Sequence, residues 1–423
     1  MRRLSVMLAG TVVLTVLVLV GGCGGGGDGK PLVGTAGKPA PPPATPAYEI
    51  IPLDEVGGQF PRVILGISDQ VLPCVTGYTW VQNVPTPGYW LTPSVPQQVS
   101  GVLSPLSGYD SSSGNGIAWD GSTVAGTCTR NEVVVLGSDT YTITHARACT
   151  WQVPGEAISE LAVPAGSSKT TANGISGNGL YISGAWESED TDPISQYNPP
   201  DPAPPVKTYH AALWSSGIWR DVGVLTSSTA PPTGRDLESH AVDVNDNGWV
   251  AGSSGQWAWY GQPAGYSYYA GRAFIWRNGT MEELLPEAGS DPYSTTGPWA
   301  INNNGQVVGQ SDGDAVMWES GSRVATQLYG TQRFEQASRA YDINDSGQIV
   351  GGTNTNGGTV GKAVIWQKNS RGKWAWTDLD TQIPANSGWH LYLARSINNK
   401  GWIGCTGTLG GVSRACLLKP ASP

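Results

Sequence analysis

The sequence predicts an all-β fold on three observations: the composition, a phrase that recurs along the chain, and a likeness between the two ends of the repeated region. The 423 residues include 58 Gly, 31 Pro, 18 Trp and 16 Tyr but only 3 Phe. Such a chain is poor in helix formers and rich in turn residues, β-branched residues and large aromatics, which favours strands. With 39% apolar residues it can bury a core.

The charge composition excludes one broad class of function. Charged residues make up 13% of the chain, about half of the roughly 25% usual for soluble domains. The net charge is −9, and only 24 residues are Lys or Arg. Because a protein that binds nucleic acid needs a basic face, no nucleic-acid partner is expected.

The first residues predict an address in the cell envelope. Arg2 and Arg3 precede the apolar run Leu4–Val20, as in a secretory signal. The segment Val20-Gly21-Gly22-Cys23 resembles the lipobox of bacterial lipoproteins, which implies that residues 1–22 are a signal peptide and that Cys23 is lipidated. Gly24 replaces the Asp that retains lipoproteins at the inner membrane, so the resemblance implies the outer membrane, on its periplasmic or surface face. The alternative is an uncleaved anchor helix, because the run is at the short edge of the ~17–25 residues that span a bilayer.

Residues 23–47 predict a tether, and residues 48–423 predict one folded domain. The tether is first Gly-rich and then Pro-rich, a composition that cannot bury a core and separates what lies at its two ends. It would hold the folded part off the membrane.

An internal repeat dictates the architecture of the folded domain. A first phrase, in outline Ile-Asn-x-x-Gly-x-Val-x-Gly, recurs with its last glycine at Gly126, Gly184, Gly252, Gly309, Gly351 and Gly404. A second phrase with Ala, apolar residues and a final Trp follows each copy in full or degraded form, and a looser phrase such as Asp-Leu closes most units. The unit is about fifty residues long with variable insertions.

Each unit predicts four short strands. The first strand ends at Ile-Asn, and a tight turn follows because Asn and Gly tolerate positive φ. The second and third strands are apolar at successive positions, so both of their faces are buried, and the Asp-Leu phrase is the fourth strand. Four-stranded sheets packed on both faces are the blades of a β-propeller. A parallel β-helix is the alternative, but it needs shorter and more uniform rungs.

The two ends of the folded domain complement each other. The last unit stops after its third strand at Leu418, and Glu49-Ile-Ile-Pro52 looks like the fourth strand Glu283-Leu-Leu-Pro286 of another unit. An N-terminal strand in the last blade would close the ring and hide both edges. A degraded copy at Ile67–Trp80 makes the total seven. The prediction is a single β-propeller of about seven four-stranded blades, or six without that copy.

The repeated phrases resemble those of the HAF family of extracellular repeats in bacterial secreted proteins. The resemblance covers Gly116 to Leu418, although only His210 supplies the family's His and only Phe274 its Phe. It implies an exported repeat protein. The family has no established catalytic residues, so the resemblance implies no activity.

The cysteines predict two disulfides. Cys128 and Cys149 lie on the second and third strands of one unit, and Cys405 and Cys416 occupy similar places in the last. Adjacent antiparallel strands bring cysteines within disulfide range, and exported proteins are oxidised, so we predict the pairs Cys128–Cys149 and Cys405–Cys416. Cys74 is left over and could instead compete for a partner in the last blade.

The sequence assigns no metal, cofactor or catalytic residue. It has no C-x-x-C pair, and its 4 His are scattered. Asp243-x-Asn245-x-Asn247-Gly248 resembles the front half of a calcium loop, but the twelfth position is Ser254 where that loop needs a carboxylate. Turn chemistry repeated in each blade explains the spacing better. No catalytic triad order, phosphate loop or zinc helix stands out.

Aromatic residues outside the repeat are the candidate binding site. The insertion Ser253–Gly271 carries Trp257, Trp259, Tyr260, Tyr266, Tyr268 and Tyr269. Aromatic clusters on loops usually mean contact surfaces, and flat rings suit stacking on a sugar. The alternative is a loop that folds over its own aromatics and caps a neighbouring blade. Trp374, Trp376, Trp389 and His390 form a second, weaker candidate.

These features together predict an envelope-anchored lipoprotein that acts as a non-catalytic binding or adhesion propeller with a glycan as its ligand. Its partners would be the membrane, through the N-terminal lipid, and a glycan or an envelope protein. Two alternatives stay open: a polysaccharide lyase or hydrolase on the same scaffold, and a structural scaffold for envelope proteins.

Overall fold

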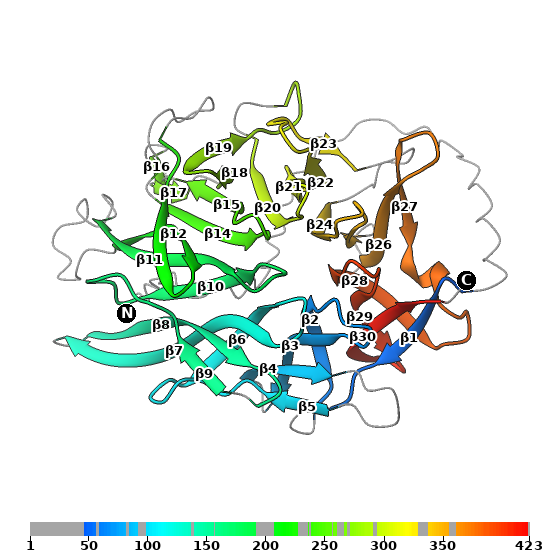
Figure 1. The fold of residues 1–423 in the computed structure, drawn as a ribbon, viewed down its shortest axis with the longest axis horizontal. Helices are drawn as coiled ribbons and strands as arrows, with labels where there is room; N and C mark the ends of the chain where they lie inside the picture. The colour runs from blue at the N-terminus through cyan, green and yellow to red at the C-terminus, as the bar shows by residue number, and fades with distance from the viewer. Residues whose placement is uncertain are drawn as a thin grey trace, which may run out of the picture.

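The computed structural model shows a ring of seven four-stranded sheets (Figure 1). It describes residues 46–55, 59–81, 84–91, 99–136, 139–155, 157–191, 207–226, 236, 238–255, 257–259, 266–268, 271–290, 294–328, 337–354 and 361–421. The predicted signal peptide, Cys23 and nearly all of the predicted tether lie outside these residues. The all-β propeller prediction is confirmed, and the blade count is seven, because the degraded N-terminal copy forms a complete blade.

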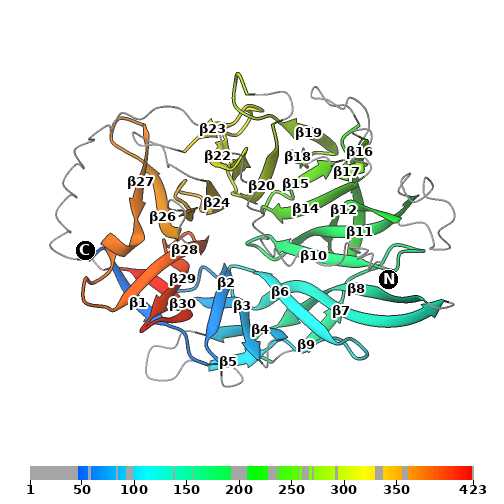
Figure 2. The ribbon, with the colours of Figure 1, turned by 180° about the vertical axis from the view of Figure 1, so that it is seen from behind.

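Each blade is an antiparallel sheet whose first strand lies at the centre of the ring, as the view from behind also shows (Figure 2). The first three blades consist of β2 (Pro61–Ile67), β3 (Cys74–Val81), β4 (Val84–Leu91) and β5 (Val99–Val102); β6 (Ser111–Ile117), β7 (Thr123–Leu136), β8 (Asp139–Gln152) and β9 (Ala157–Glu160); and β10 (Thr170–Ile175), β11 (Tyr181–Thr191), β12 (Lys207–Ser215) and β13 (Ile218–Gly223).

The remaining blades follow the same order along the chain. They consist of β14 (Glu238–Val244), β15 (Val250–Gly255), β18 (Arg272–Arg277) and β19 (Thr280–Leu284); β20 (Thr296–Ile301), β21 (Val307–Ser311), β22 (Asp314–Trp318) and β23 (Thr326–Gln327); β24 (Ser338–Ile343), β25 (Ile349–Asn354), β26 (Gly361–Lys368) and β27 (Trp374–Asp378); and β28 (Trp389–Ile397), β29 (Ile403–Leu409), β30 (Val412–Pro420) and β1 (Tyr48–Pro52). A short 3-10 helix, η2 (Leu379–Gln382), follows β27, and β16 (Trp257–Trp259) pairs with β17 (Tyr266–Tyr268) outside the blades.

The N-terminal strand closes the ring as predicted. β1 pairs with β30 in antiparallel register, from Tyr48 opposite Pro420 to Pro52 opposite Cys416. The first described strand and the last thereby share one sheet, so the last blade has its fourth strand and β30 has no open edge.

The repeated Asn and Gly form the predicted turn between the first two strands. The side-chain oxygen of Asn245 accepts hydrogen bonds from the backbone N–H groups of Asn247 and Trp249, each at 3.0 Å. Gly248 has φ of 71°, a left-handed conformation that glycine adopts without strain. The same arrangement recurs at Asn302 and Asn398. The calcium-like spacing is therefore turn chemistry, as the sequence favoured.

The glycine near the end of each first phrase is required by strand packing. In the sixth blade, a Cβ atom on Gly351 would lie 1.9 Å from the carbonyl oxygen of Arg339 and 2.8 Å from the ring of Trp366. Backbone and a buried ring leave no room for even a methyl group, so the position accepts only glycine.

The core lies between the blades. The tryptophans that end the third strands are buried, as predicted: Trp151, Trp214, Trp276, Trp318 and Trp366. Three of their indole N–H groups donate to a carbonyl just after the fourth strand of the preceding blade, each at 2.8 Å, at Ser104, Ala162 and Leu285. Each of these tryptophans therefore joins two blades as well as filling the space between them.

A cross-strand ion pair recurs within the blades and explains two more repeated positions. The residue that begins the second phrase reaches an acid on the fourth strand: Arg147 to Glu160 at 3.0 Å, His210 to Asp221 at 3.3 Å, Arg272 to Glu283 at 3.9 Å and Lys362 to Asp378 at 2.6 Å. The acid of the Asp-Leu phrase and the charged residue of the second phrase are thus structural partners.

A helix that spans a membrane needs both sufficient length and high hydropathy. Within the described ranges, no helix combines the length and the apolar character that crossing a bilayer requires.

Candidate functional site

The first strands of the seven blades surround a cavity of about 760 Å³ at the centre of the ring, which we also call the central channel. This size lies within the roughly 300–1,000 Å³ typical of small-molecule sites. The cavity is therefore the candidate site, and its chemistry depends on which side chains the first strands turn inward.

A β-bulge in every blade supplies those side chains. Each first strand shifts register against its second strand at the same place, two residues before the Ile of the Ile-Asn phrase. A bulge leaves one residue unpaired and re-aims its side chain. The seven unpaired residues all line the cavity: Leu65, Asn115, Asn173, Val242, Trp299, Tyr341 and Arg395.

Three consecutive blades give this cavity an aromatic and cationic wall, which we call the Trp-Tyr-Arg wall (Trp299, Tyr341 and Arg395). The rings of Trp299 and Tyr341 meet edge to face, with centroids 5.2 Å apart and planes at 62°. The guanidinium carbon of Arg395 lies 4.8 Å from the centroid of the Tyr341 ring. A cation at that distance over an aromatic face is attracted by the ring.

Two donors of the Trp-Tyr-Arg wall have no partner in the described part of the chain. Nε1 of Trp299 and Nε of Arg395 are buried and make no hydrogen bond to a described residue. Leaving a buried donor unsatisfied costs about 1–3 kcal/mol. Both groups belong to residues that line the cavity, and either would gain a hydrogen bond from an acceptor that reaches it.

The second and third blades contribute two amides to the cavity. Asn115 and Asn173 each donate from Nδ2 to a backbone carbonyl of the next blade, at Ala172 and Ala241, both at 2.7 Å. No described residue donates to their side-chain oxygens. Because the blades follow one another around the ring, these amides lie across the channel from the Trp-Tyr-Arg wall.

Two half-buried carboxyl groups join blades directly behind the bulges. Asp243 accepts hydrogen bonds from the N–H groups of Val244 at 2.8 Å and of Ile301 in the next blade at 2.9 Å. Asp342 does the same with Ile343 at 2.8 Å and with Ile397 of the last blade at 2.7 Å. Neither oxygen set is left free for a metal, and the backbone bonds give both groups a structural role.

Burial changes the acidity of these carboxyl groups. It raises the pKa of Asp243 to about 6, against the opposing effect of the two N–H donors. Burial likewise raises the pKa of Asp342 to about 8, and the charge of Asp243 adds to that rise. Both groups are thus titratable near neutral pH, which is a property found at functional sites.

One end of the channel, which we call the turn end, is bordered by a belt of side chains (Asp69, Asp246, Asn303, Asp345 and Asn399). Backbone N–H groups donate from one blade to the next: Asp246 to Asn303 at 2.9 Å, Asn303 to Asp345 at 2.8 Å, Asp345 to Asn399 at 2.7 Å and Asn399 to Asp69 at 2.8 Å. The belt ties consecutive blades together, so its polar atoms are largely engaged.

The opposite end of the channel, the insertion end, is lined by Glu238, His240, Ser253 and Gln310. His240 stacks on Tyr209, with ring centroids 5.5 Å apart. Burial lowers the pKa of His240 to about 4, so the ring is neutral at physiological pH. The aromatic insertion leaves the fourth blade at this end, because Ser253 lies on the strand that precedes it.

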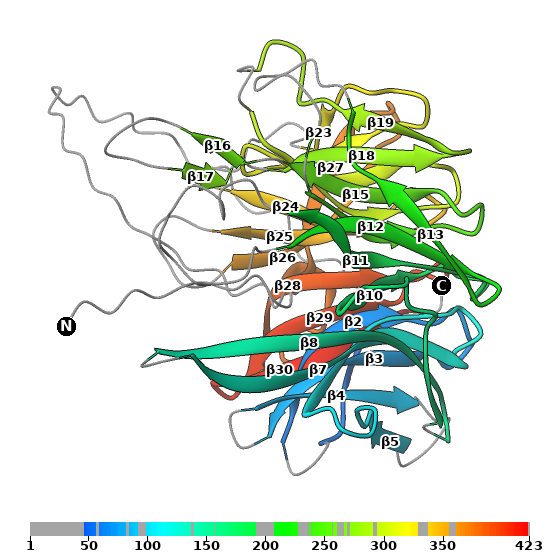
Figure 3. The ribbon, with the colours of Figure 1, turned by 90° about the vertical axis from the view of Figure 1, so that its left-hand side faces the viewer.

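The structure places part of the predicted aromatic site. β16 and β17 form a hairpin that projects from one side of the ring (Figure 3), with Trp257 opposite Tyr268 and Trp259 opposite Tyr266. Tyr260 and Tyr269 lie outside the described residues. The hairpin stands at the insertion end of the channel, and its role as a contact surface stays a prediction.

The residues of the weaker aromatic candidate lie away from the central cavity. Trp374 is buried and packs with Trp376 in the core between the fifth and sixth blades, and Trp389 packs against the core of the last. Nδ1 of His390 contacts the Asp380 carboxylate at 2.5 Å. None of these residues lines the cavity.

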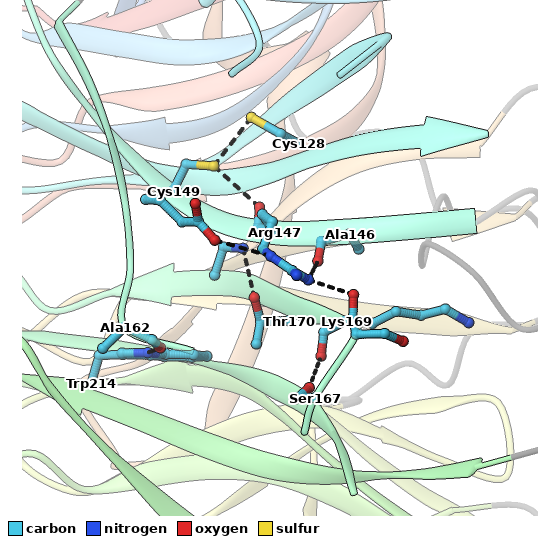
Figure 4. A network of polar contacts seen from close by, with 12 residues as sticks. Cys128, Ala146, Arg147, Cys149, Ala162, Ser167, Lys169, Thr170 and Trp214 are labelled. Atoms are coloured by element: carbon cyan, nitrogen blue, oxygen red, sulfur yellow. Dashed lines mark hydrogen bonds and ion pairs between the residues drawn. The ribbon is translucent and has the colours of Figure 1, made fainter. Parts of the chain in front are cut away.

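The predicted disulfides are not present in this structure. Cys128 and Cys149 are close neighbours (Figure 4), but their sulfur atoms are 3.1 Å apart and not bonded. Cys405 lies directly opposite Cys416 in the register, and both are buried free thiols. Cys74 is buried as well, and burial raises its pKa to about 12. The strand placement was correct, and pairing under oxidising conditions stays a prediction.

Sequence reasoning missed the bulge residues, although a signal for them exists. Their position is the most variable one inside the first phrase, with Trp, Tyr, Arg, Val, Leu and Asn at equivalent places. A position whose residue type varies between copies of an otherwise constant repeat is not required for packing of the blade core. In the described ranges, no three His, Cys, Asp or Glu residues cluster as a metal site would need.

Comparison with known proteins identifies a family and leaves the activity open. Residues 126–411 match the family described as "Protein of unknown function (DUF3466)". No curated protein matches the sequence.

One solved structure with a similar chain path is an acylaminoacyl peptidase from Pyrococcus horikoshii, at 9% identity and a TM-score of 0.42, covering 84% of this chain and 52% of that one. Another is a Trypanosoma rangeli sialidase in complex with sialic acid, at 8% identity and a TM-score of 0.36, covering 89% of this chain and 58% of that one. A third is YjhT, at 11% identity and a TM-score of 0.35, covering 77% of this chain and 99% of that one. The chain thus spans little more than half of the first and of the sialidase, and none of these likenesses bears on function.

Proposed function

Because this chain belongs to the family described as "Protein of unknown function (DUF3466)", its activity has to be inferred from its own site, and we propose that it is a non-catalytic propeller that binds a glycan in its central channel. The observation that carries the proposal is that the seven bulge residues all line the cavity and give it aromatic, amide and cationic side chains.

The cavity has the two kinds of group that a sugar requires. A pyranose ring has an apolar C–H face, which packs on aromatic rings such as Trp299 and Tyr341. Its hydroxyl groups need acceptors and donors, and the oxygens of Asn115 and Asn173 and the indole N–H of Trp299 supply them. A few directed polar groups among apolar ones is the usual composition of a small-ligand site.

The second part of the proposal is the address. We propose that the N-terminal segment anchors the propeller to the outer membrane through a lipid on Cys23, with residues 23–47 as the tether. The support is the lipobox-like segment and the composition of the tether. Metabolic labelling with a radioactive fatty acid tests it, since Cys23→Ser should abolish the label and leave the protein soluble.

Binding of mono- and disaccharides by isothermal titration calorimetry tests the proposal. Tyr341→Ala should weaken binding at least tenfold, because it removes the central ring of the Trp-Tyr-Arg wall. The double variant Trp257→Ala, Trp259→Ala is the matched control, because it removes two aromatics from the hairpin and none from the channel.

Either outcome of that comparison is informative. Loss of binding in the hairpin variant alone would move the site to the insertion and contradict the channel. A wild-type protein that binds no saccharide in a broad panel would overturn the proposed function itself.

One observation favours a second candidate function, a polysaccharide hydrolase or lyase. Asp243 and Asp342 both line the cavity, and burial raises the pKa of each, as in a general acid. Their engagement with backbone N–H groups argues for a structural role instead. Release of reducing ends from a polysaccharide panel by the wild-type protein, lost in Asp342→Asn, would favour the enzyme.

The third function predicted from the sequence is a scaffold for envelope proteins, and crosslinking in cells distinguishes it from glycan binding. Crosslinking would then recover a partner protein whose capture survives Tyr341→Ala.

A further inference from the structure

We propose that the ligand of the channel carries a carboxylate, which Arg395 holds, so that the preferred glycans are acidic sugars of the uronic acid class. This inference rests on the proposed function and makes it more specific. The observation that supports it is that Arg395, a cation of the cavity, has no ion pair in the described part of the chain.

Arg395 is the sole Lys or Arg among the residues found to line the cavity. It makes no ion pair and no hydrogen bond with any residue in the described ranges, and its Nε is buried. The Arg395 side chain is half-buried, and withdrawing part of a cation from water without a partner charge has a cost. Its stacking on Tyr341 offsets part of that cost. An anion bound in the cavity would give this side chain the partner charge that the described residues do not supply.

The acids that line the cavity form no ion pair with Arg395 in the described ranges. Asp345 accepts hydrogen bonds from Asn303 and Asn399 instead. The carboxyl groups of Asp243 and Asp342 accept backbone hydrogen bonds, and neither forms an ion pair with Arg395. The charge that acts on Asp342 is that of Asp243, and burial holds much of Asp342 in its neutral form at pH 7. Glu238 lies on β14 in the fourth blade, three blades away from Arg395 around the ring.

The geometry of Arg395 suits a carboxylate in particular. A guanidinium presents a planar fork of N–H donors that matches the two oxygens of a carboxylate. The contact with Tyr341 holds the guanidinium group beside the aromatic ring. A sugar acid lying on these rings would bring its carboxylate to Arg395 and its hydroxyl groups to Trp299 Nε1 and to the amides across the channel.

The ligand series that tests this inference needs no mutation. D-Galacturonate, its methyl ester and D-galactose share one ring and differ in charge, as do D-glucuronate, its methyl ester and D-glucose. Calorimetric titration of the wild-type protein should show at least tenfold tighter binding of the acids than of the esters and the neutral sugars. The preference should shrink as salt is raised, because the contact is ionic.

Variants of Arg395 then assign the preference. Arg395→Gln should reduce the affinity for the acids to that for the neutral sugars, and Arg395→Lys should retain part of the preference. Thermal unfolding of both variants and Arg130→Gln, which removes a positive charge outside the cavity, serve as controls. Arg130→Gln should keep the ratio of acid to neutral affinity.

The results separate this inference from the proposed function. Equal binding of acids, esters and neutral sugars by the wild-type protein would overturn the inference and leave glycan binding intact. An acid preference that survives Arg395→Gln would also overturn it. Binding of none of these sugars and of no longer glycan by the wild-type protein would overturn the proposed function.

Discussion

At the scale of single residues, the most informative position is Asp342, because its acidity couples folding to pH. Burial raises its pKa from an ordinary value of 3.8 to about 8. Between these values the folded chain holds a proton that the unfolded chain has released. The contribution of this group to the free energy of unfolding therefore falls as the pH rises from about 4 to about 8, by at most ~1.4 kcal/mol per pH unit.

Asp342→Asn should flatten this dependence, since the amide does not titrate. It should cost about 1–3 kcal/mol at pH 5, because one of the two backbone N–H groups loses its acceptor, and less at pH 8. Urea denaturation at pH 5, 6.5 and 8 measures both effects, with Asp120→Asn on an exposed turn as the control. Parallel pH profiles for wild type and Asp342→Asn would contradict the assignment.

At the scale of elements, the turn after each first strand does more than reverse the chain. The side-chain oxygen of Asn302 accepts two backbone N–H bonds of its own turn, and its Nδ2 donates to the carbonyl of Asn344 in the next blade at 3.0 Å. One buried side chain therefore fixes a hairpin and joins two blades.

Asn302→Ala should destabilise the protein by about 2–4 kcal/mol, because two N–H groups and one carbonyl lose their partner in a buried place. Asn304→Ala in the same turn is the matched control, because its exposed amide makes one bond, to the carbonyl of Asp345 at 2.7 Å. Chemical denaturation compares the two variants. A loss of stability equal in both would mean that the buried turn bonds are not what holds the blades.

The same elements show why sequence predicted the strands and not the site. The repeated Asn, Gly and Trp residues each have a fixed structural role, so they recur at regular positions in the sequence. That periodicity predicted the four strands of each blade and the ring. A bulge depends on a register shift between two strands, which residue type alone does not specify. The inward direction of Tyr341 and Arg395 was therefore hidden, whereas Trp257 and Trp259 drew attention because they are aromatic and lie outside the repeat.

At the scale of the whole molecule, closure of the ring depends on one short strand. β1 holds Ile50 opposite Leu418 and Ile51 opposite Leu417. These two isoleucines pack against the cores on both sides of the last blade. Without β1, β30 would be an open edge with Leu417 and Leu418 uncovered, so the stability of all seven blades is linked to five residues at the start of the folded domain.

The double variant Ile50→Asp, Ile51→Asp should therefore lower the free energy of unfolding by about 3–6 kcal/mol, because two half-buried apolar side chains become charged in a buried interface. Glu49→Ala is the control: it removes an exposed ion pair with Lys419 at 3.0 Å, which is worth at most about 1 kcal/mol. Thermal denaturation and binding of 1-anilinonaphthalene-8-sulfonate measure the loss of stability and the exposure of β30. Because closure joins the first and last strands of the ring, the whole domain should unfold in one transition at a lower temperature. Unfolding of the last blade alone, with the remaining blades unchanged, would show that the ring does not need its closing strand.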